Sequence, residues 1–275
     1  MAITTTMRVM ILVKAAPVLT SQLQESMCVA AMSLDDPPRW IRLHPVPFRD
    51  LEDTTKFRKY QEVTVEVFRP KSDRRPESWT PIEGSIVPGA TIGTDHAWSA
   101  RRQRVSSLGA ELTMCELVEM NRSGSGPDTP SLAVVRTREA PKFVIEERDE
   151  EQLSKWRSRA EAIGSQPSLF EDAAQPKAPF EVIPWRFSYR YHCRVPDCNG
   201  HKQTIVDWEA VALYRNVRSK PDWRELMRQK FEDEMWAPGK DTVLFVGNQE
   251  QHPQSFLVLG VFWPPDAPIQ PSLLE

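Results

Sequence analysis

The chain has 275 residues, of which 40% are hydrophobic and 27% are charged, and its net charge is −3. This length is sufficient for one large domain or two small ones, and the slightly acidic balance argues against a protein that coats nucleic acid tightly and non-specifically. The apolar run MRVMILV at residues 7–13 is too short to span a bilayer. We therefore expect no membrane segment, and the four cysteines are typical of reduced thiols in a cytoplasmic protein.

The N-terminal half is predicted to be rich in strands. Apolar or alternating patterns indicate strands at 8–14, 28–34, 40–43, 61–68, 112–120, 132–136 and 142–147, and a helix is predicted at 96–108. A charged helix at 148–162 and a Pro-rich linker follow. These patterns predict a β-rich domain at 1–147, a helix and linker at 148–184, a domain at 185–264 and a Pro-rich tail at 265–275.

The fold class predicted from these elements is α+β. The N-terminal domain is expected to contain a mixed, mostly antiparallel sheet. The smaller C-terminal domain is expected to combine strands and helices, with a hairpin whose tip resembles a zinc knuckle.

That hairpin lies in the stretch FSYRYHCRVPDCNGHKQTIVDWE at residues 187–209. Two alternating sets of side chains predict a half-buried strand, one apolar (Phe187, Tyr189, Tyr191, Cys193) and one polar (Ser188, Arg190, His192, Arg194). The turn residues VPDCNG and a second strand at 202–208 follow. Cys193, Cys198 and His201 should therefore meet at the tip.

Thiolate and imidazole groups are the ligands that zinc prefers in tetrahedral sites. We predict a zinc site at Cys193, Cys198 and His201, with a structural role. A fourth ligand is missing locally, and Cys28, Cys115, His252 or a water molecule is left open for that place. The alternative is that reduced side chains occupy the turn without a metal.

Asp207 and Glu209 follow directly after the hairpin. Two carboxylates on one strand face could hold Mg²⁺ beside a phosphate, as in a metal-dependent nuclease or phosphodiesterase. The alternative is that Asp207 caps the next helix and Glu209 lies in its first turn.

A surplus of basic residues occurs between residues 39 and 75, where ten Lys and Arg residues outnumber six Asp and Glu residues and aromatic side chains are interspersed. Such a band suits phosphate contacts and base stacking. The residues predicted to bind nucleic acid, DNA rather than RNA, are Arg39, Arg42, Arg49, Arg58, Lys59, Arg74 and Arg75.

A short motif occurs twice, as QPSLF at 166–170 and QPSLL at 270–274. Both copies resemble the peptide by which bacterial proteins dock on the DNA polymerase sliding clamp, an extended segment that inserts an apolar pair into a groove. The candidate partner-binding residues are Gln166, Leu169, Phe170, Gln270, Leu273 and Leu274.

Segments in both halves of the chain resemble a prokaryotic family without an assigned activity, found in mobile-element and defence neighbourhoods. The segments are WIRLHPVPFR, FRKYQ and DRRPESW in the first half, and FSYRYHC, DWE, LFVGN and FLVLGVFWPP in the second. The resemblance implies DNA-linked biology, such as antiviral defence. The sequence thus predicts a nucleic-acid-associated accessory or recognition protein. A metal-dependent nuclease and an adaptor that docks a protein partner are the alternatives.

Overall fold

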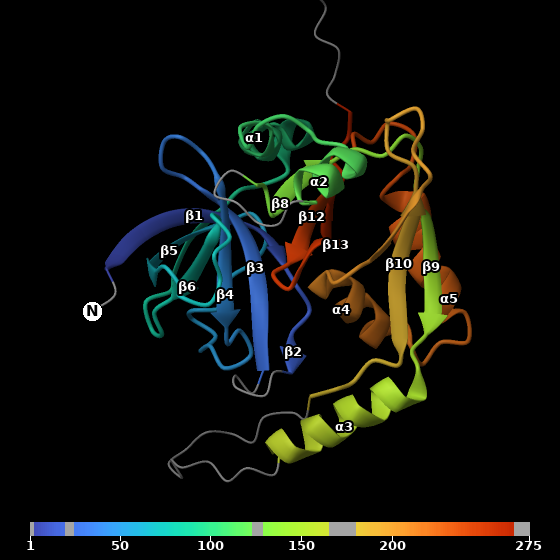
Figure 1. The fold of residues 1–275 in the computed structure, drawn as a ribbon, viewed down its shortest axis with the longest axis horizontal. Coiled ribbons are helices and arrows are strands. Elements are labelled where there is room, and N and C mark those ends of the chain that lie inside the picture. The colour runs from blue at the N-terminus through green and yellow to red at the C-terminus, as the bar shows by residue number, and fades with distance from the viewer. Residues whose placement is uncertain (1–2, 20–24, 123–128, 165–179, 267–275) are drawn as a thin grey trace, which may run out of the picture.

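The computed structural model describes residues 3–19, 25–122, 129–164 and 180–266. Within these residues the strands form three sheets, surrounded by five α-helices and one π-helical segment (Figure 1). Nearly all strand pairs are antiparallel, with β4 and β6 the parallel pair, so the fold is mixed α+β. None of the helices in the described residues is long and apolar enough to cross a membrane.

The first sheet closes into a barrel. Its ring consists of β1 (Thr4–Lys14), β3 (Glu25–Ser33), β4 (Trp40–Val46), β6 (Ser78–Pro81) and β5 (Gln61–Phe68), and β5 pairs with β1 to complete it. β2 (Val18–Leu19) extends β3, and β7 (Val87–Thr91) extends β5. Val63, Val65 and Val67 are buried in the apolar core of this barrel, which explains the alternation of β5.

A second sheet covers one side of the barrel and consists of β8 (Leu132–Val135), β12 (Val243–Gln249) and β13 (His252–Phe262). β1 is consequently buried on both faces. Val9 and Ile11 join the barrel core, whereas Met10 and Leu12 pack with residues of the second sheet. Over residues 9–13 the strand is covered on both sides and has no polar face, and this is the reason for the uninterrupted apolar run VMILV.

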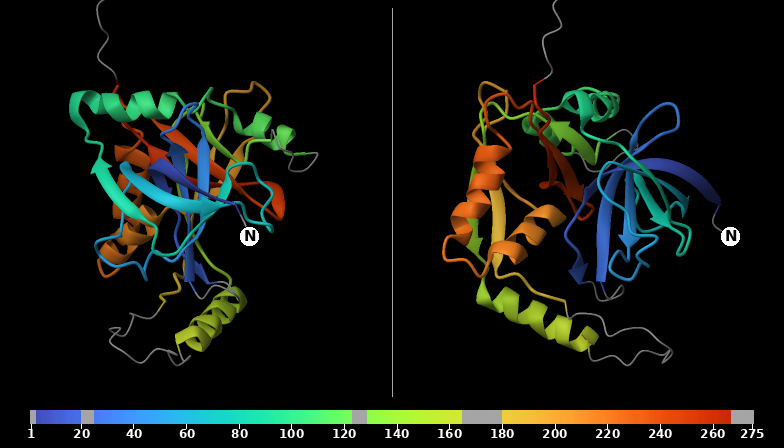
Figure 2. Two further views of the ribbon diagram at one scale, coloured as in Figure 1. Left: turned by 90° about the vertical axis from the view of Figure 1, so that its left-hand side faces the viewer. Right: turned by 180° about the vertical axis from the view of Figure 1, so that it is seen from behind.

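The third sheet contains β9 (Lys142–Glu147), β10 (Trp185–Tyr191) and β11 (His201–Thr204). Its aromatic face packs with α4 (Trp208–Val217), α5 (Trp223–Arg228) and the π-helix η1 (Gln229–Glu234). Phe143 stacks on Phe231 with ring centroids 5.3 Å apart. α1 (Asp95–Ser106) and α2 (Met114–Met120) lie at one end of the molecule, and α3 (Glu150–Gly164) lies at the opposite end (Figures 1 and 2).

Two parts of the sequence take a different place from the one predicted. β8 and β9, which the sequence analysis assigned to the N-terminal domain, pair with β12 and β10 of the C-terminal part. The stretch 112–120, predicted as a strand, forms the helix α2 from Met114 onward. The physical reason is the start signal at Thr113, whose side chain accepts a hydrogen bond from the backbone N–H of Glu116.

Candidate metal centre

Four side chains from three parts of the chain converge at one end of β10 and β11. Cys115 comes from α2, Cys193 and Cys198 from the connection between the two strands, and His201 from the first position of β11. Their sulfur and nitrogen atoms all lie within 4.8 Å of one another. The sequence-predicted ligands are thus brought together, and Cys115 takes the fourth place.

The distances within the cluster are short. Cys115 Sγ lies 3.4 Å from Cys193 Sγ and 3.5 Å from His201 Nε2, and Cys198 Sγ lies 3.2 Å from His201 Nε2. An ion about 2.3 Å from each thiolate would leave the sulfurs about 3.8 Å apart. The four atoms therefore need only small shifts to surround one metal ion.

Local sequence signals place these ligands. Thr113 and Glu116 form a reciprocal cap, in which Glu116 Oε2 also accepts a hydrogen bond from the backbone N–H of Thr113 at 2.7 Å. This cap fixes the first turn of α2, and that turn carries Cys115. In the hairpin, Gly200 adopts a φ of +89°, and a β-carbon there would lie 3.2 Å from His192 Nε2. Glycine therefore permits the turn that brings His201 back to the cysteines.

Backbone and charge also favour a bound cation. The backbone N–H groups of Cys193 and Gly200 each donate to Cys198 Sγ over 3.4 Å. Burial, together with the sulfur atoms of Cys193 and Cys198, raises the pKa of the Cys115 thiol to about 12. Three thiolates this close repel one another, so all three ionise together only when a metal ion compensates their charge.

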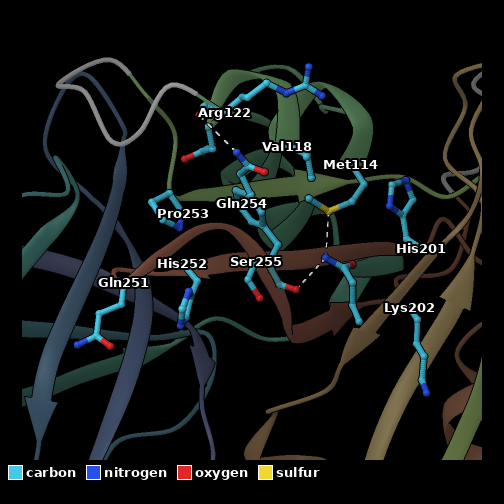
Figure 3. Close-up of a pocket in the computed structure, with 13 residues that line it drawn as sticks. Met114, Val118, Arg122, His201, Lys202, Gln251, His252, Pro253, Gln254 and Ser255 are labelled. Atoms are coloured by element: carbon cyan, nitrogen blue, oxygen red, sulfur yellow. Dashed lines mark hydrogen bonds between the residues drawn. The ribbon is translucent and has the colours of Figure 1, made fainter.

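A groove of about 750 Å³ lies beside the cluster (Figure 3). One wall comes from α2 and the residues after it, and the others come from β11, from the first residues of β13 and from Gln251 in the turn before β13. None of the lining residues in the described part of the chain carries a carboxylate. The lining residues are Met114, Val118, Asn121, Arg122, His201, Lys202, Gln203, Gln251, His252, Pro253, Gln254, Ser255 and Phe256.

Comparison with protein families divides the chain close to residue 108. A family model described as "Domain of unknown function (DUF8757)" matches residues 110–275, more than half of the chain. The chain belongs to the DUF8757 family. A second model, "Domain of unknown function (DUF8758)", matches residues 5–107, and no curated protein matches the chain. The Cys/His cluster and the groove thus lie in the DUF8757 region, and the barrel belongs to the DUF8758 region.

Asp207 connects these two regions. Lys59 Nζ, from the DUF8758 region, lies 3.0 Å from Asp207 Oδ2 and 3.0 Å from Glu209 Oε2. Asp207 is also the N-cap of α4, where its Oδ1 accepts the backbone N–H of Glu209 at 3.0 Å. Gly260 leaves the necessary space, because a β-carbon there would lie 3.3 Å from Asp207 Oδ2.

This arrangement matches the helix-capping interpretation of Asp207. The Asp207 side chain is only 1% exposed, and the ammonium group of Lys59 already lies between the two carboxylates that were candidates for Mg²⁺. Burial raises the pKa of Asp207 to about 6, because desolvation outweighs the attraction of Lys59. We therefore interpret Asp207 and Glu209 as structural groups.

The basic band between residues 39 and 75 does not form one surface. Arg42 is buried and donates to the backbone oxygen of Ser131 at 3.0 Å. Arg75 is also buried and donates to the backbone oxygen of Asn248 at 2.8 Å. Like Lys59, these two cations join the DUF8758 region to the DUF8757 region.

The other predicted nucleic-acid-binding residues are nearer to solvent. Arg49 is partly buried and pairs with Glu25 over 2.7 Å. Arg39, Arg58 and Arg74 are exposed. The candidate clamp-docking residues Gln166, Leu169, Phe170, Gln270, Leu273 and Leu274 lie outside the described residues.

Proposed function

We propose that the protein holds one structural zinc ion in the Cys115, Cys193, Cys198 and His201 cluster and acts as a nucleic-acid-associated accessory protein, with the adjacent groove as its binding site. The observation that carries this proposal is the composition of the groove. Among the residues that the structure describes, its wall contains cations, imidazoles and amides but no carboxylate, although Asp and Glu number 38 in the chain.

Zinc suits the donor set because three sulfurs and one imidazole nitrogen are soft ligands in a small space. Four protein ligands leave no open coordination position, which is typical of a structural site. The ion would connect Cys115 of α2 to His201 of β11. Residues of both elements line the groove, so the metal would help to keep the groove in shape.

Nucleic acid suits the groove because phosphates need cations and base edges need donors and acceptors. Arg122 and His252 supply a cation and an imidazole, and Gln251 and Gln254 supply exposed amides. Arg122 pairs with Glu119, but both side chains are more than 60% exposed. Such a surface pair is weak and exchanges readily for a phosphate.

The first experiment measures zinc content by native mass spectrometry and oligonucleotide binding by fluorescence anisotropy. The wild type should carry one zinc ion and bind short single-stranded DNA or RNA, with an affinity that falls as salt is raised. Cys115→Ser should lose the zinc, whereas Cys28→Ser, a cysteine outside the cluster, should retain it.

The groove is tested by the double variant Arg122→Ala/His252→Ala, which should bind about tenfold more weakly. The comparison variant is Arg58→Ala/Arg74→Ala, which removes two exposed cations of the barrel region. Loss of binding in the barrel variant but not in the groove variant would contradict the groove as the site. No binding of any oligonucleotide by the wild type would contradict the function itself.

A further inference from the structure

The outer face of the third sheet carries an alignment of basic side chains. In the strand register, Arg190 of β10 lies directly opposite Lys202 of β11 on one side and opposite Lys142 of β9 on the other. All three residues are exposed. They form one row across three neighbouring strands, about 10 Å from end to end. We call this set, Lys142, Arg190 and Lys202, the basic row.

The row points away from the core. Phe187, Tyr189 and Tyr191 belong to the buried cluster, so the alternate residues of β10 lie on the other face of the sheet, where Arg190 is exposed, Arg186 is partly exposed and Ser188 is buried. The outward positions of the paired strands hold four cations and one carboxylate, which gives this face a formal charge of 4 − 1 = +3. These charged positions are Lys142, Arg186, Arg190, Lys202 and Glu146.

The single carboxylate does not neutralise the row. Glu146 pairs with Lys202 over 2.6 Å. Among the described residues, neither Lys142 nor Arg190 has a carboxylate within ion-pair distance. Like charges that lie directly opposite each other across strands destabilise a sheet. Glu146 also interacts electrostatically with Arg190 and Arg186, but one carboxylate compensates only one of the four positive charges, and an external anion would compensate the others.

The basic row is continuous with the groove. Lys202 belongs to both, and His201, the preceding residue, is a ligand in the metal cluster and also lines the groove. We propose that the basic row binds the sugar–phosphate backbone of a nucleic-acid strand whose bases lie in the groove. This inference rests on the proposed function and adds the phosphate-binding surface to it.

A regularly spaced polyanion fits the row better than a single small anion does. The three cations lie on three neighbouring strands, with about 5 Å between one strand and the next, so successive phosphates of one strand can contact all of them in turn. A flexible single strand can leave the groove at Lys202 and follow the row across the sheet. The salt dependence of binding then reports the number of contacts, about 0.7 units of slope for each phosphate neutralised on a single strand.

The test compares Lys142→Gln/Arg190→Gln with a control of equal charge change, Lys155→Gln/Arg157→Gln on the exposed helix α3. Binding of a fluorescein-labelled single-stranded oligonucleotide is measured over a series of salt concentrations. In the row variant, affinity at low salt should fall at least tenfold, and the slope of log K against log salt should become shallower by about 1.4. The control should match the wild type in both quantities.

Thermal unfolding of the same proteins tests whether a loss of binding comes from a loss of protein stability. Because the row variant relieves like-charge repulsion, it should be at least as stable as the wild type without ligand. If the wild type binds the oligonucleotide and the row variant keeps its affinity and salt slope, the basic row is not part of the site, while the groove proposal stands. If the wild type binds polyglutamate but no oligonucleotide, both proposals are overturned.

Discussion

At the level of single residues, Asp207 connects local structure to tertiary structure. One of its oxygens caps α4 and the other accepts from Lys59, which is 148 residues away in sequence. Burial raises the pKa of Asp207 from 3.8 to about 6. The folded protein therefore holds this proton more tightly than the unfolded chain does. As the pH rises from about 4 to about 6, the contribution of Asp207 to the free energy of unfolding therefore falls, and the folded protein loses stability.

Lys59→Met should leave Asp207 as a buried charge without its main partner. We expect a loss of about 3 kcal/mol in unfolding free energy near neutral pH. The deficit should shrink at about pH 5, where Asp207 becomes protonated. Urea unfolding of the wild type and the variant at both pH values measures this difference in unfolding free energy. The double variant Lys59→Met/Asp207→Asn should recover most of the loss. An equal deficit at both pH values would contradict this account.

At the level of elements, the short helix α2 contributes one candidate metal ligand and one wall of the groove. It has only seven residues and depends on its reciprocal cap at Thr113 and Glu116. A helix of this length has little stability of its own. Its position is therefore fixed by the cap, by packing of the buried Met114 and Leu117, and by the bond that Cys115 would make to a metal.

Thr113→Ala should destabilise the start of α2 by about 1 kcal/mol, because the Thr113 hydroxyl no longer accepts the N–H of Glu116. Since Cys115 lies two residues further along, zinc affinity should fall about fivefold in a competition assay with a chromophoric chelator. Thr113→Ser keeps the hydroxyl and should bind zinc like the wild type. Unchanged affinity in Thr113→Ala would show that the cap does not position Cys115.

At the level of the whole molecule, the barrel and the Cys/His cluster are stabilised by different residues. The barrel core contains none of the four candidate ligands, which belong to or border the apolar cluster around the third sheet. Buried cations at Arg42, Lys59 and Arg75 join the two regions. Three cations of the basic band that suggested a nucleic-acid surface thus hold the two regions together, whereas Arg39, Arg58 and Arg74 of the same band are exposed.

Removal of zinc by a chelator should consequently act on one region. We expect faster hydrogen exchange in α2 and in the turn between β10 and β11, and little change in β1, β3 and β5 of the barrel. Hydrogen-exchange mass spectrometry of the zinc-loaded and chelated protein measures this difference. The Cys115→Ser variant should give the chelated pattern without chelator. Uniform loss of protection in both regions would contradict this division.

The sequence alone determined the features that depend on near neighbours. The period-2 patterns located most strands, and Cys193, Cys198 and His201 could be grouped because they lie within one hairpin. The outward position of Arg190 also followed from alternation in β10. Each of these inferences depends on backbone geometry over a few residues, which local composition specifies.

Only the tertiary structure decided which distant segments meet. Cys115 lies 78 residues from Cys193, and Lys59 lies 148 residues from Asp207. Lys142 lies in one row with Arg190 and Lys202 only because β9 and β11 both pair with β10. The order of strands in a sheet depends on burying apolar faces of the whole chain together, and no local pattern contains that information. The fourth ligand, the basic row and the buried ion pairs all follow from that order.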